Sequence, residues 1–544
     1  MIPVIDIFAG PGGLGEGFSQ AGFKVLLSAE MDPVACETLQ LRKFFNSFPQ
    51  GKVPESYYQF LRNELTLKTL SELHPEEWNA SEAEVVQAEL GTEQGNIEFY
   101  QRLEKCLCGV KDFILIGGPP CQAYSLAGRS RMLGGGNELN SLTKQQAKTL
   151  RSRLASDFYK DERHTLYKEY IKILSRYQPS IFIMENVKGM GSAKTHASAT
   201  PGSVFENICA GLRDPFATTN IKPVSRKRPR GYKLYSLNID EENLFPHGEI
   251  SSASQCTLRS EDYGVPQSRH RIIIVGVRSD ITCAPSRLKK VMTPSTVEDA
   301  IGDMPSLRSG LSKEVDSYEC WREALAVQVR DALLGHTSID SVLSENLEKL
   351  RGENCILGRG GRYFRTESPI KKKTSNGLHN AIFDSKIGGV IQHETRSHIR
   401  GDLLRYFLVS TFGEVFGHSP KLSDWEGNFE TVRPNHSNII RTVTGLETRT
   451  HNDRFKVQVW GKPSSTVVSH IAKDGHYYIH PDPTQCRSLT VREAARLQTF
   501  PDNYYFCGNR TKQYHQVGNA VPVLLARQIA TIISSLIAQI RGKS

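Results

Sequence analysis

The chain has 544 residues, 38% of them apolar and 23% charged, which allows a packed core and excludes a wholly disordered chain. At about 100–200 residues per domain, this length allows two to four domains. Lys and Arg number 68 and Asp and Glu 58, and the resulting net charge of +10 suits a polyanionic partner without requiring one. The eleven cysteines include no CxxC pair, which argues against a disulfide framework and a zinc ribbon.

The two ends of the chain indicate no export and no membrane. The sequence runs from Met1 almost directly into the strand-like residues 4–8, so no secretory signal is visible. The most apolar long stretch, 521–540, carries Arg527, Gln528 and several hydroxyls, and it is typical of an amphipathic core helix rather than a membrane span. We therefore expect a cytoplasmic, nucleoid-associated protein with reduced thiols and no membrane partner.

Residues 4–18, VIDIFAGPGGLGEGF, join an apolar β-branched run to a glycine-dense turn and a helix-like stretch. Gly10, Gly12 and Gly15 satisfy GxGxxG, a pattern in which glycine permits tight turning and close approach of the backbone to a ligand. A second apolar run ends in Glu30, and an acid at that place can accept both ribose hydroxyls. These features predict a Rossmann-like nucleoside site, which suits a nicotinamide dinucleotide and S-adenosylmethionine equally.

A candidate nucleophile follows the next buried run, 113–116. That run ends in Gly-Gly-Pro-Pro, and Cys121 comes directly after it. α/β folds bind substrates at the carboxyl ends of their strands. A free thiol has a pKa of about 8.5, so its loop must favour the thiolate for rapid attack. A lone cysteine is usually a small buried hydrophobe, but the Pro-Pro lock and the strand-end position favour a nucleophile here.

Two further strand ends carry charged side chains. The run 179–187 passes through four apolar residues into Glu185, which can act as a general acid if burial raises its pKa; an N-cap or a loop ion pair is the alternative. Arg269 and Arg271 precede the buried strand 272–276, and in an extended segment they share one face. Paired guanidiniums suit an anionic or carbonyl-bearing substrate, although they are also compatible with two solvated arginines.

In this order FAGPGG, PPCQ, ENV and QSRHR, followed by 487–504 and QYHQVGNAVP at 513–522, resemble the DNA (cytosine-5) methyltransferase family of the bacterial modification type. The resemblance implies an α/β, Rossmann-like S-adenosylmethionine-dependent domain, with a smaller target-recognition domain inserted before the C-terminal motifs. It decides the cofactor in favour of S-adenosylmethionine, as methyl donor, with no metal. Within the C-terminal block, Thr490 and Glu493 form a capping box that opens a helix ending before Pro501.

The resemblance also implies roles for individual residues. In the family, Phe8 and the loop glycines would hold the methionine part, Glu30 the ribose and Met31 the adenine, while Glu89 stands where the family carries an Asp for the adenine amine. The full set of implied cofactor residues is Phe8, Ala9, Gly10, Gly12, Gly13, Glu30, Met31, Glu89, Pro120, Leu166, Asn519 and Ala520.

The implied chemistry starts from cytosine C5, a poor nucleophile. Addition of the Cys121 thiolate at C6 would convert the ring into an enamine that attacks the methyl group. Glu185 would contact N3 and the exocyclic amine and Arg271 the O2 side, while Arg269 would brace Glu185 or bind a phosphate. The target base must leave the duplex to reach these groups, and the polar segment 122–163, with Gly134–Gly136 as a hinge, would fill the gap.

The motif order predicts three parts: 1–285 and 485–544 form the catalytic domain, and 286–484 form the target-recognition domain. Within these parts, 40–110 is expected to be a surface insertion, and 191–232 an insertion with a basic end. Residues 358–373 are rich in glycine, aromatic and basic residues and predict a DNA-facing loop, in which Lys371, Lys372 and Lys373 would contact phosphates.

The functional prediction is a DNA (cytosine-5-)-methyltransferase that acts as a monomer on double-stranded DNA, with a restriction endonuclease or other defence-system proteins as possible partners. Alternatives are an RNA cytosine-5 methyltransferase, a nicotinamide-dependent oxidoreductase, and a DNA-binding protein without catalysis. The oxidoreductase leaves PPCQ, ENV and QSRHR without a role, and the intact Cys121 and Glu185 argue against lost catalysis. A recognition region of roughly 200 residues favours duplex DNA over RNA.

Overall fold

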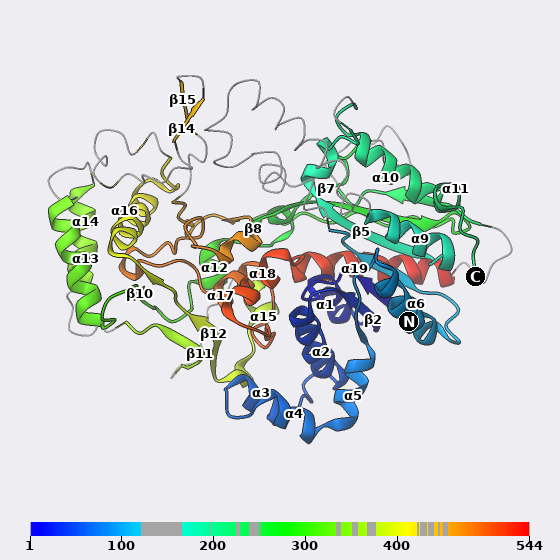
Figure 1. The fold of residues 1–544 in the computed structure, drawn as a ribbon, viewed down its shortest axis with the longest axis horizontal. Helices are drawn as coiled ribbons and strands as arrows, with labels where there is room; N and C mark the ends of the chain where they lie inside the picture. Colours follow the sequence, from blue (N-terminus) through cyan, green and yellow to red (C-terminus); the bar gives the residue numbers. More distant parts are fainter. Residues whose placement is uncertain are drawn as a thin grey trace.

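A computed structural model describes most of the chain (Figure 1). The described residues are 2–120, 166–196, 199–224, 229–238, 250, 252–332, 339–350, 357–366, 377–421, 424, 432, 440–443, 446–449 and 455–542. Cys121, the segment 122–163 and Lys371, Lys372 and Lys373 lie outside them.

One sheet organises the catalytic part, in the order β3-β2-β1-β4-β5-β9-β6, with β7 also paired to β9. Five strands are parallel to one another: β1 (Val4–Ile7), β2 (Val25–Glu30), β3 (Val85–Gln87), β4 (Ile114–Gly117) and β5 (Ile181–Val187). The strand β9 (His270–Arg278) is antiparallel to β5, to β6 (Tyr232–Tyr235) and to β7 (Thr257–Arg259). The predicted Rossmann-like α/β fold is thereby confirmed.

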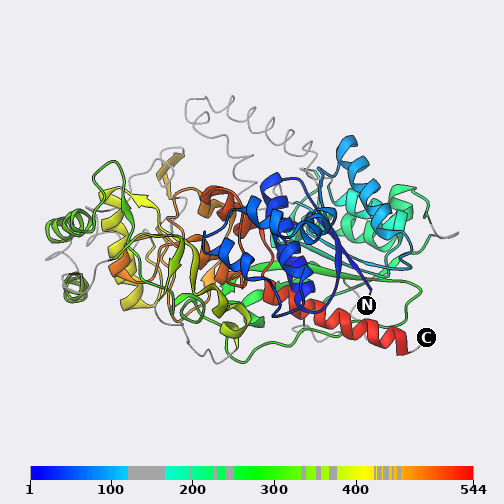
Figure 2. The same ribbon diagram turned by 90° about the horizontal axis from the view of Figure 1, so that it is seen from below.

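Helices cover both faces of this sheet (Figures 1 and 2). On one face α6 (Glu93–Leu107), α9 (Tyr167–Tyr177) and α10 (Ser203–Arg213), with α11 (Pro215–Thr219) beside them, cover a core that includes Ile5 and Phe182. On the other face α1 (Gly13–Gln20) and α19 (Val523–Gly542) cover a core that includes Ile116 and Ile273. The helix α2 (Pro33–Ser47) lies beside β2 and β3.

The apolar C-terminal helix α19 is long and apolar enough, by composition, to cross a membrane. Its residues Leu525, Ile529, Ile533 and Leu536 are nevertheless buried in the core beneath the sheet. A Cβ on Gly17 of α1 would lie 2.4 Å from the Cβ of Ala526, so the two helices meet at almost backbone distance. This packing confirms the predicted core helix.

The predicted recognition region, residues 286–484, has its own core. The helices α13 (Tyr318–Ala332), α14 (Asp340–Lys349) and α16 (Arg400–Phe416) pack around Trp321, which is fully buried. Short strands accompany them: β10 (Gly310–Leu311) with β13 (Ser397–His398), β11 (Gly360–Arg365) with β12 (Gly389–Glu394), and β14 (Ile440–Val443) with β15 (Leu446–Arg449).

The expectation of a loop over 358–373 is wrong for its described first part, and the expected contact with DNA stays a prediction. Residues 360–365 form β11, which pairs in antiparallel register with β12 over Gly360–Arg365. Tyr363 in this strand packs into an apolar core, and the Arg362 guanidinium lies 5.3 Å from the Phe60 ring. Arg362 and Tyr363 of this strand are thus used for packing, a use that composition alone does not distinguish from DNA contact.

The C-terminal block joins the two parts through buried charges. The helix α17 (Val491–Leu497) begins with the predicted Thr490–Glu493 capping box. The Glu493 carboxylate, fully buried, accepts two hydrogen bonds from Arg487, at 2.6 and 2.7 Å. Burial by itself would raise the pKa of Glu493, but Arg487 outweighs burial and holds it below its ordinary value. The α17 helix therefore begins on a fully desolvated ion pair.

We predict that Glu493→Gln destabilises the protein by about 3–5 kcal/mol, because it leaves the Arg487 charge buried without a counter-charge. The lowered pKa of Glu493 means that the wild-type contribution is present above the ordinary carboxyl pKa and is lost as the pH falls below it. Chemical denaturation at neutral and acidic pH measures both. Glu314→Gln is the matched control, because its pair with Arg400 is solvent-exposed. Equal effects of the two substitutions would contradict the prediction.

Candidate active site

The loop between β1 and α1 contains three residues with left-handed backbone conformations. Phe8 has a φ of 55°, a left-handed conformation that a bulky side chain rarely adopts, and Gly10 and Gly12 follow at 56° and 91°. The Ala9 amide donates to the Ala29 carbonyl of β2 at 3.0 Å, which holds the loop against the neighbouring strand end. Strain of this kind persists where surrounding contacts enforce it and is common at ligand sites.

Glu30 ends β2 beside this loop, as predicted. Its carboxylate accepts hydrogen bonds from the amides of Gly10 at 2.8 Å and Asp32 at 3.0 Å. A carboxylate has about four acceptor positions, so these two bonds orient the group and leave acceptor capacity for two ligand hydroxyls. The adjacent Met31 is 55% exposed, so its side chain is accessible to a ligand ring.

The end of α18 (Arg510–Asn519) returns to the same loop. A Cβ on Gly13 would lie 2.3 Å from the Val521 carbonyl and 3.3 Å from the Ala520 Cβ, so glycine is required there for packing. Asn519 is exposed beside buried Ala520. Tyr504, to which sequence reasoning gave no role, donates its hydroxyl to the Pro11 carbonyl. The structure thus brings the N-terminal glycine loop and the C-terminal block together.

Glu89 and Leu166 lie near the carboxyl end of β3. Glu89 is exposed, and its carbonyl accepts from the Thr92 amide and hydroxyl, at 3.2 and 2.8 Å. A Cβ on Gly91 would lie 3.0 Å from Leu166 Cδ2, so Leu166 borders the same strand end. Pro120 follows β4 and is partly buried. The predicted cofactor residues therefore lie at or just after the carboxyl ends of β1, β2, β3 and β4, or at a helix end. Leu166 precedes α9, and Asn519 and Ala520 lie at the end of α18.

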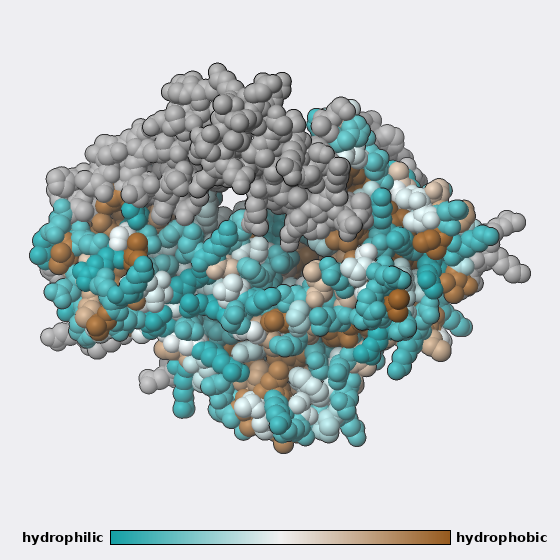
Figure 3. All heavy atoms as spheres, in the orientation of Figure 1, coloured by the Kyte–Doolittle hydropathy of each residue, from teal (hydrophilic) through white to brown (hydrophobic). Residues whose placement is uncertain are grey.

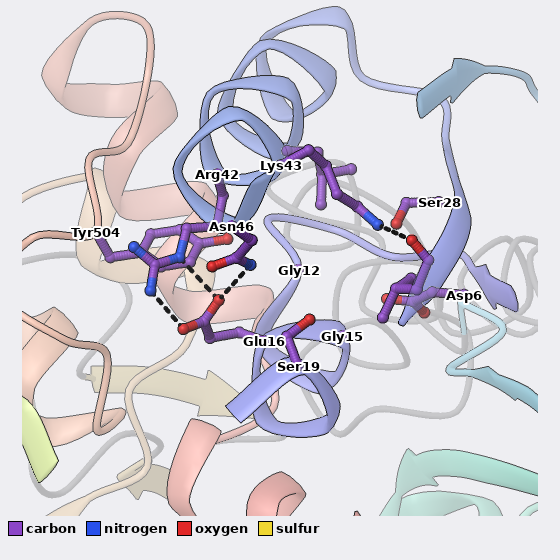
Figure 4. Close-up of a pocket in the computed structure, with 12 residues that line it drawn as sticks. Asp6, Gly12, Gly15, Glu16, Ser19, Ser28, Arg42, Lys43, Asn46 and Tyr504 are labelled. Carbon is purple, nitrogen blue, oxygen red and sulfur yellow. Dashed lines mark hydrogen bonds and ion pairs between the residues drawn. The ribbon is translucent and has the colours of Figure 1, made fainter. Parts of the chain in front are cut away.

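Beneath the glycine loop lies a small cavity of about 20 Å³, enough for one water molecule (Figure 4). Arg42 and Asn46 point at Glu16 on one side, and Lys43 reaches across to the Val25 carbonyl at 2.6 Å. Asp6 of β1 lines the other side, and neither of its oxygens has a hydrogen-bond partner among the described residues. Burial raises the pKa of Asp6 to about 7.

The second group of predicted residues meets where β4, β5 and β9 adjoin. Glu185 Oε1 lies 2.9 Å from Arg271 Nε, and the two side chains are 14% and 13% exposed. A Cβ on Gly118 would lie 2.7 Å from Glu185 Oε2, so the carboxylate borders the Gly-Gly-Pro-Pro loop. Asn186 Nδ2 donates to the Pro119 carbonyl at 3.4 Å, a contact that sequence reasoning missed. Cys121, two residues beyond Pro119, lies outside the described residues.

Arg269 and Arg271 have different partners, which corrects two expectations. The bond from the Arg269 amide to the Gln267 carbonyl marks a tight turn between β8 (Gln267–Ser268) and β9, so the alternation of an extended strand does not hold. The buried Arg269 guanidinium donates to the carbonyls of Val467 and Gly518, at 2.7 and 3.2 Å. Its contacts brace the C-terminal segments, whereas Arg271 braces Glu185.

Burial lowers the pKa of Arg269, and the neighbouring Arg271 lowers it further. Its Nε has no hydrogen-bond partner among the described residues.

Nearby, Ser268, Thr466 and Lys456 line an open hollow of about 560 Å³. No group of three His, Cys, Asp or Glu side chains in the described part of the chain could hold a metal ion.

Comparison with known proteins decides the family. A model of the C-5 cytosine-specific DNA methylase family matches residues 2–67, 155–214 and 252–535. The chain belongs to this family. It is therefore a DNA cytosine-5 methyltransferase, and S-adenosylmethionine is its methyl donor. Membership does not favour the RNA methyltransferase or nicotinamide alternatives.

Full-length relatives agree with the match. The chain is 29% identical to the Type II methyltransferase M.Bpa9945I of Bacillus paralicheniformis, over 98% of this chain and 99% of that protein. It is 23% identical to the Type II methyltransferase M.AgeI of Thalassovita gelatinovora, with the same coverage. Among solved structures, a putative DNA modification methyltransferase encoded within an E. coli prophage is 18% identical, with 99% and 100% of the chains covered and a TM-score of 0.48.

The buried Asp6 predicts a pH-dependent stability. A carboxyl group whose pKa is 3.8 in the unfolded chain and about 7 in the fold binds more protons when folded. The contribution of Asp6 to the free energy of unfolding should therefore fall as pH rises from about 4 to 7, by up to about 1.4 kcal/mol per pH unit. Asp6→Asn should remove this slope, whereas Glu37→Gln, at an exposed position of α2, should keep it. Denaturation curves across this range test it, and parallel slopes in wild type and Asp6→Asn would refute the assignment.

Proposed function

We propose that the enzyme methylates C5 of a flipped cytosine in a specific duplex sequence, through a covalent bond between Cys121 and C6. The observation that carries this proposal is the Glu185–Arg271 pair beside the Gly-Gly-Pro-Pro loop that leads to Cys121. Addition of the thiolate at C6 makes C5 nucleophilic. C5 then takes the methyl group of the donor, whose sulfur leaves as a neutral thioether, and loss of the C5 proton with elimination of Cys121 releases the methylated base.

The residues around the base have separate roles in this proposal. Glu185 holds N3 and the exocyclic amine and shares a proton with the ring as Cys121 adds. Arg271, through Nε, fixes the Glu185 carboxylate and presents its remaining N–H groups to the O2 side. Asn186 supports the nucleophile loop through the Pro119 carbonyl. Arg269 keeps the segments at Val467 and Gly518 next to the base pocket.

We propose that S-adenosylmethionine occupies the edge formed by the carboxyl ends of β1, β2 and β3, where it supplies an electrophilic methyl group. The oriented Glu30 carboxylate binds the ribose, the exposed Met31 lies against the adenine, and Glu89 meets the adenine amine. Phe8, Ala9, Gly10, Gly12 and Gly13 form the methionine side. Pro120, Leu166, Asn519 and Ala520 complete the wall.

We propose that residues 286–484 read the DNA sequence, between catalytic segments 1–285 and 485–544. The separate core around Trp321 supports an independently packed unit. The relatives named Type II methyltransferases support a restriction–modification setting, with a cognate endonuclease as partner. We further propose a cytoplasmic monomer that acts on the nucleoid and needs no metal.

Cys121→Ala should abolish methylation and leave duplex binding intact, because the thiolate is required for addition but not for DNA affinity. Bisulfite sequencing of plasmid from expressing cells measures methylation and identifies the target sequence. Duplexes carrying 5-fluorocytosine at that position should trap a covalent adduct with wild type. The exposed Cys108→Ala is the control and should form the adduct normally. An adduct with Cys121→Ala would refute the assignment.

Exchanging residues 286–484 with the same block of a relative should transfer sequence preference and leave S-adenosylmethionine affinity unchanged. The physical reason is that base contacts specify sequence, whereas the proposed cofactor residues all lie outside the block. Bisulfite sequencing and cofactor titration measure the two properties. If the chimera folds, methylates and keeps the original target, recognition lies elsewhere.

A further inference from the structure

The helical insertion formed by α3 (Glu55–Leu61), α4 (Leu67–Leu73) and α5 (Pro75–Ala83) packs on the recognition region. We use the name recognition arm for the described part of 360–394, which contains β11, α15 (Leu378–Ile382), η5 (Ser385–Ile387) and β12. Buried Tyr57, Tyr58 and Phe60 of α3 share one core with Ile387 and Ile391 of the arm. Apolar side chains of this region reach the surface around α3 and α4 (Figure 3, lower centre).

The polar centre of this interface is the Asp384 carboxylate. Its Oδ2 accepts from the Tyr58 hydroxyl at 3.1 Å and from Asn503 Nδ2 at 2.7 Å. Its Oδ1 accepts from the Lys386 amide at 3.0 Å and caps the short helix η5. Both oxygens therefore have defined partners, and three separate chain segments meet at one residue of the arm.

Asn503 connects this centre to the cofactor half of the molecule. Its Oδ1 accepts from Arg42 Nη1 at 2.9 Å, and the Tyr57 hydroxyl donates to its carbonyl at 2.8 Å. Arg42 also forms two bonds to buried Glu16 of α1, at 2.8 and 2.6 Å. The amide group of Asn503 therefore has one fixed orientation, with its oxygen toward Arg42 and its nitrogen toward Asp384.

Cations of the arm add contacts on both sides of this centre. The Arg362 guanidinium lies 5.3 Å from the Phe60 ring and 5.2 Å from the Tyr505 ring. Lys386 Nζ lies 5.6 Å from the Tyr58 ring and donates to the Gly51 carbonyl at 2.9 Å. Such contacts restrict the rotation of the arm as well as its distance from α3.

We propose that the helical insertion positions the recognition arm relative to the base pocket, and that Tyr58, Asp384 and Asn503 are positioning residues for DNA methylation. The match to the family model is interrupted from 68 to 154, so α3, which supplies the contacts described above, lies inside the match, whereas α5 and all of α4 except Leu67 lie outside it. The inference rests on the proposed reading of DNA by 286–484. A fixed arm matters because a displacement of about 1 Å at the surface that holds the DNA would move the target base away from the geometry in which it reacts.

The test compares Tyr58→Phe and Asp384→Ala with wild type in the full-length enzyme. The DNA probes are a duplex carrying the sequence found by bisulfite sequencing and a second duplex with one base pair changed. Asp384→Ala should raise both KM and Kd for the first duplex about tenfold, because it removes all three hydrogen bonds to a charged group. The kcat and the S-adenosylmethionine affinity should change less than about twofold, because neither proposed site is touched.

Three further results are expected of a positioning role. Discrimination between the two duplexes should fall in Asp384→Ala and recover largely in Asp384→Asn, which keeps one acceptor oxygen. Tyr58→Phe should have an effect of the same kind but smaller, and it should add nothing to Asp384→Ala because its partner is already gone. Tyr177→Phe, which breaks a 3.0 Å bond to Glu104 on the catalytic domain, is the matched control and should leave every DNA parameter unchanged.

Several outcomes overturn the proposal. Variants that lose thermal stability but keep wild-type KM, Kd and discrimination would show that the contacts serve folding alone. Additive effects of Tyr58→Phe and Asp384→Ala would show that the two residues act independently. If wild type methylates no cytosine, the proposed function fails; Kd values for a mixed-sequence duplex then decide the positioning role separately, and equal Kd values for Asp384→Ala and Tyr177→Phe reject it.

Discussion

The direction of the strands is the constraint on which this site depends. Because β1 to β5 are all parallel, their carboxyl ends meet at one edge of the sheet, and the loops that leave that edge diverge between β1 and β4. Glu30 and the glycine loop lie on one side of this divergence, and Glu185 with the Gly-Gly-Pro-Pro loop lies on the other. The antiparallel β9 then brings Arg271 to Glu185, since Val187 pairs with Arg271 in register.

Buried arginines hold the second half of the chain to this sheet. Arg269 bonds to the Val467 and Gly518 carbonyls, and Arg492 to those of Ile391, Pro501 and Tyr504. A guanidinium has five N–H groups in a rigid plane, so one side chain can join several backbone segments that have no regular pairing. Burial of the charge is costly, as the lowered pKa of Arg492 to about 10 indicates. This arrangement makes the junction dependent on precise geometry.

The parts of the site that were predicted correctly are those that a short stretch of neighbouring residues determines. An apolar run followed by glycine or by an acid marks a strand end, and this placed Phe8, Glu30 and Glu185 at one edge. The Arg269 and Arg271 contacts were not predictable in this way, because a tight turn at Gln267 breaks the alternation on which the expectation relied. Tyr504 and Asn186 were missed because their partners are the backbone carbonyls of Pro11 and Pro119, which carry no sequence signal. Composition likewise misassigned β11, where basic and aromatic residues pack on α3.

The segment 503–507 gives the two halves of the site a common support. The Tyr504 hydroxyl bonds to Pro11 in the glycine loop, and the side chain of its neighbour Asn503 joins Arg42 to Asp384 of the recognition arm. The Phe506 amide donates to Gln392 of β12 at 3.1 Å, and the Cys507 amide donates to Thr38 of α2 at 2.9 Å. Successive residues thus alternate between the cofactor half and the recognition region. A rigid displacement of this segment would move both sets of contacts together, so residues 286–484 and the glycine loop are mechanically linked through Asn503, Tyr504, Phe506 and Cys507.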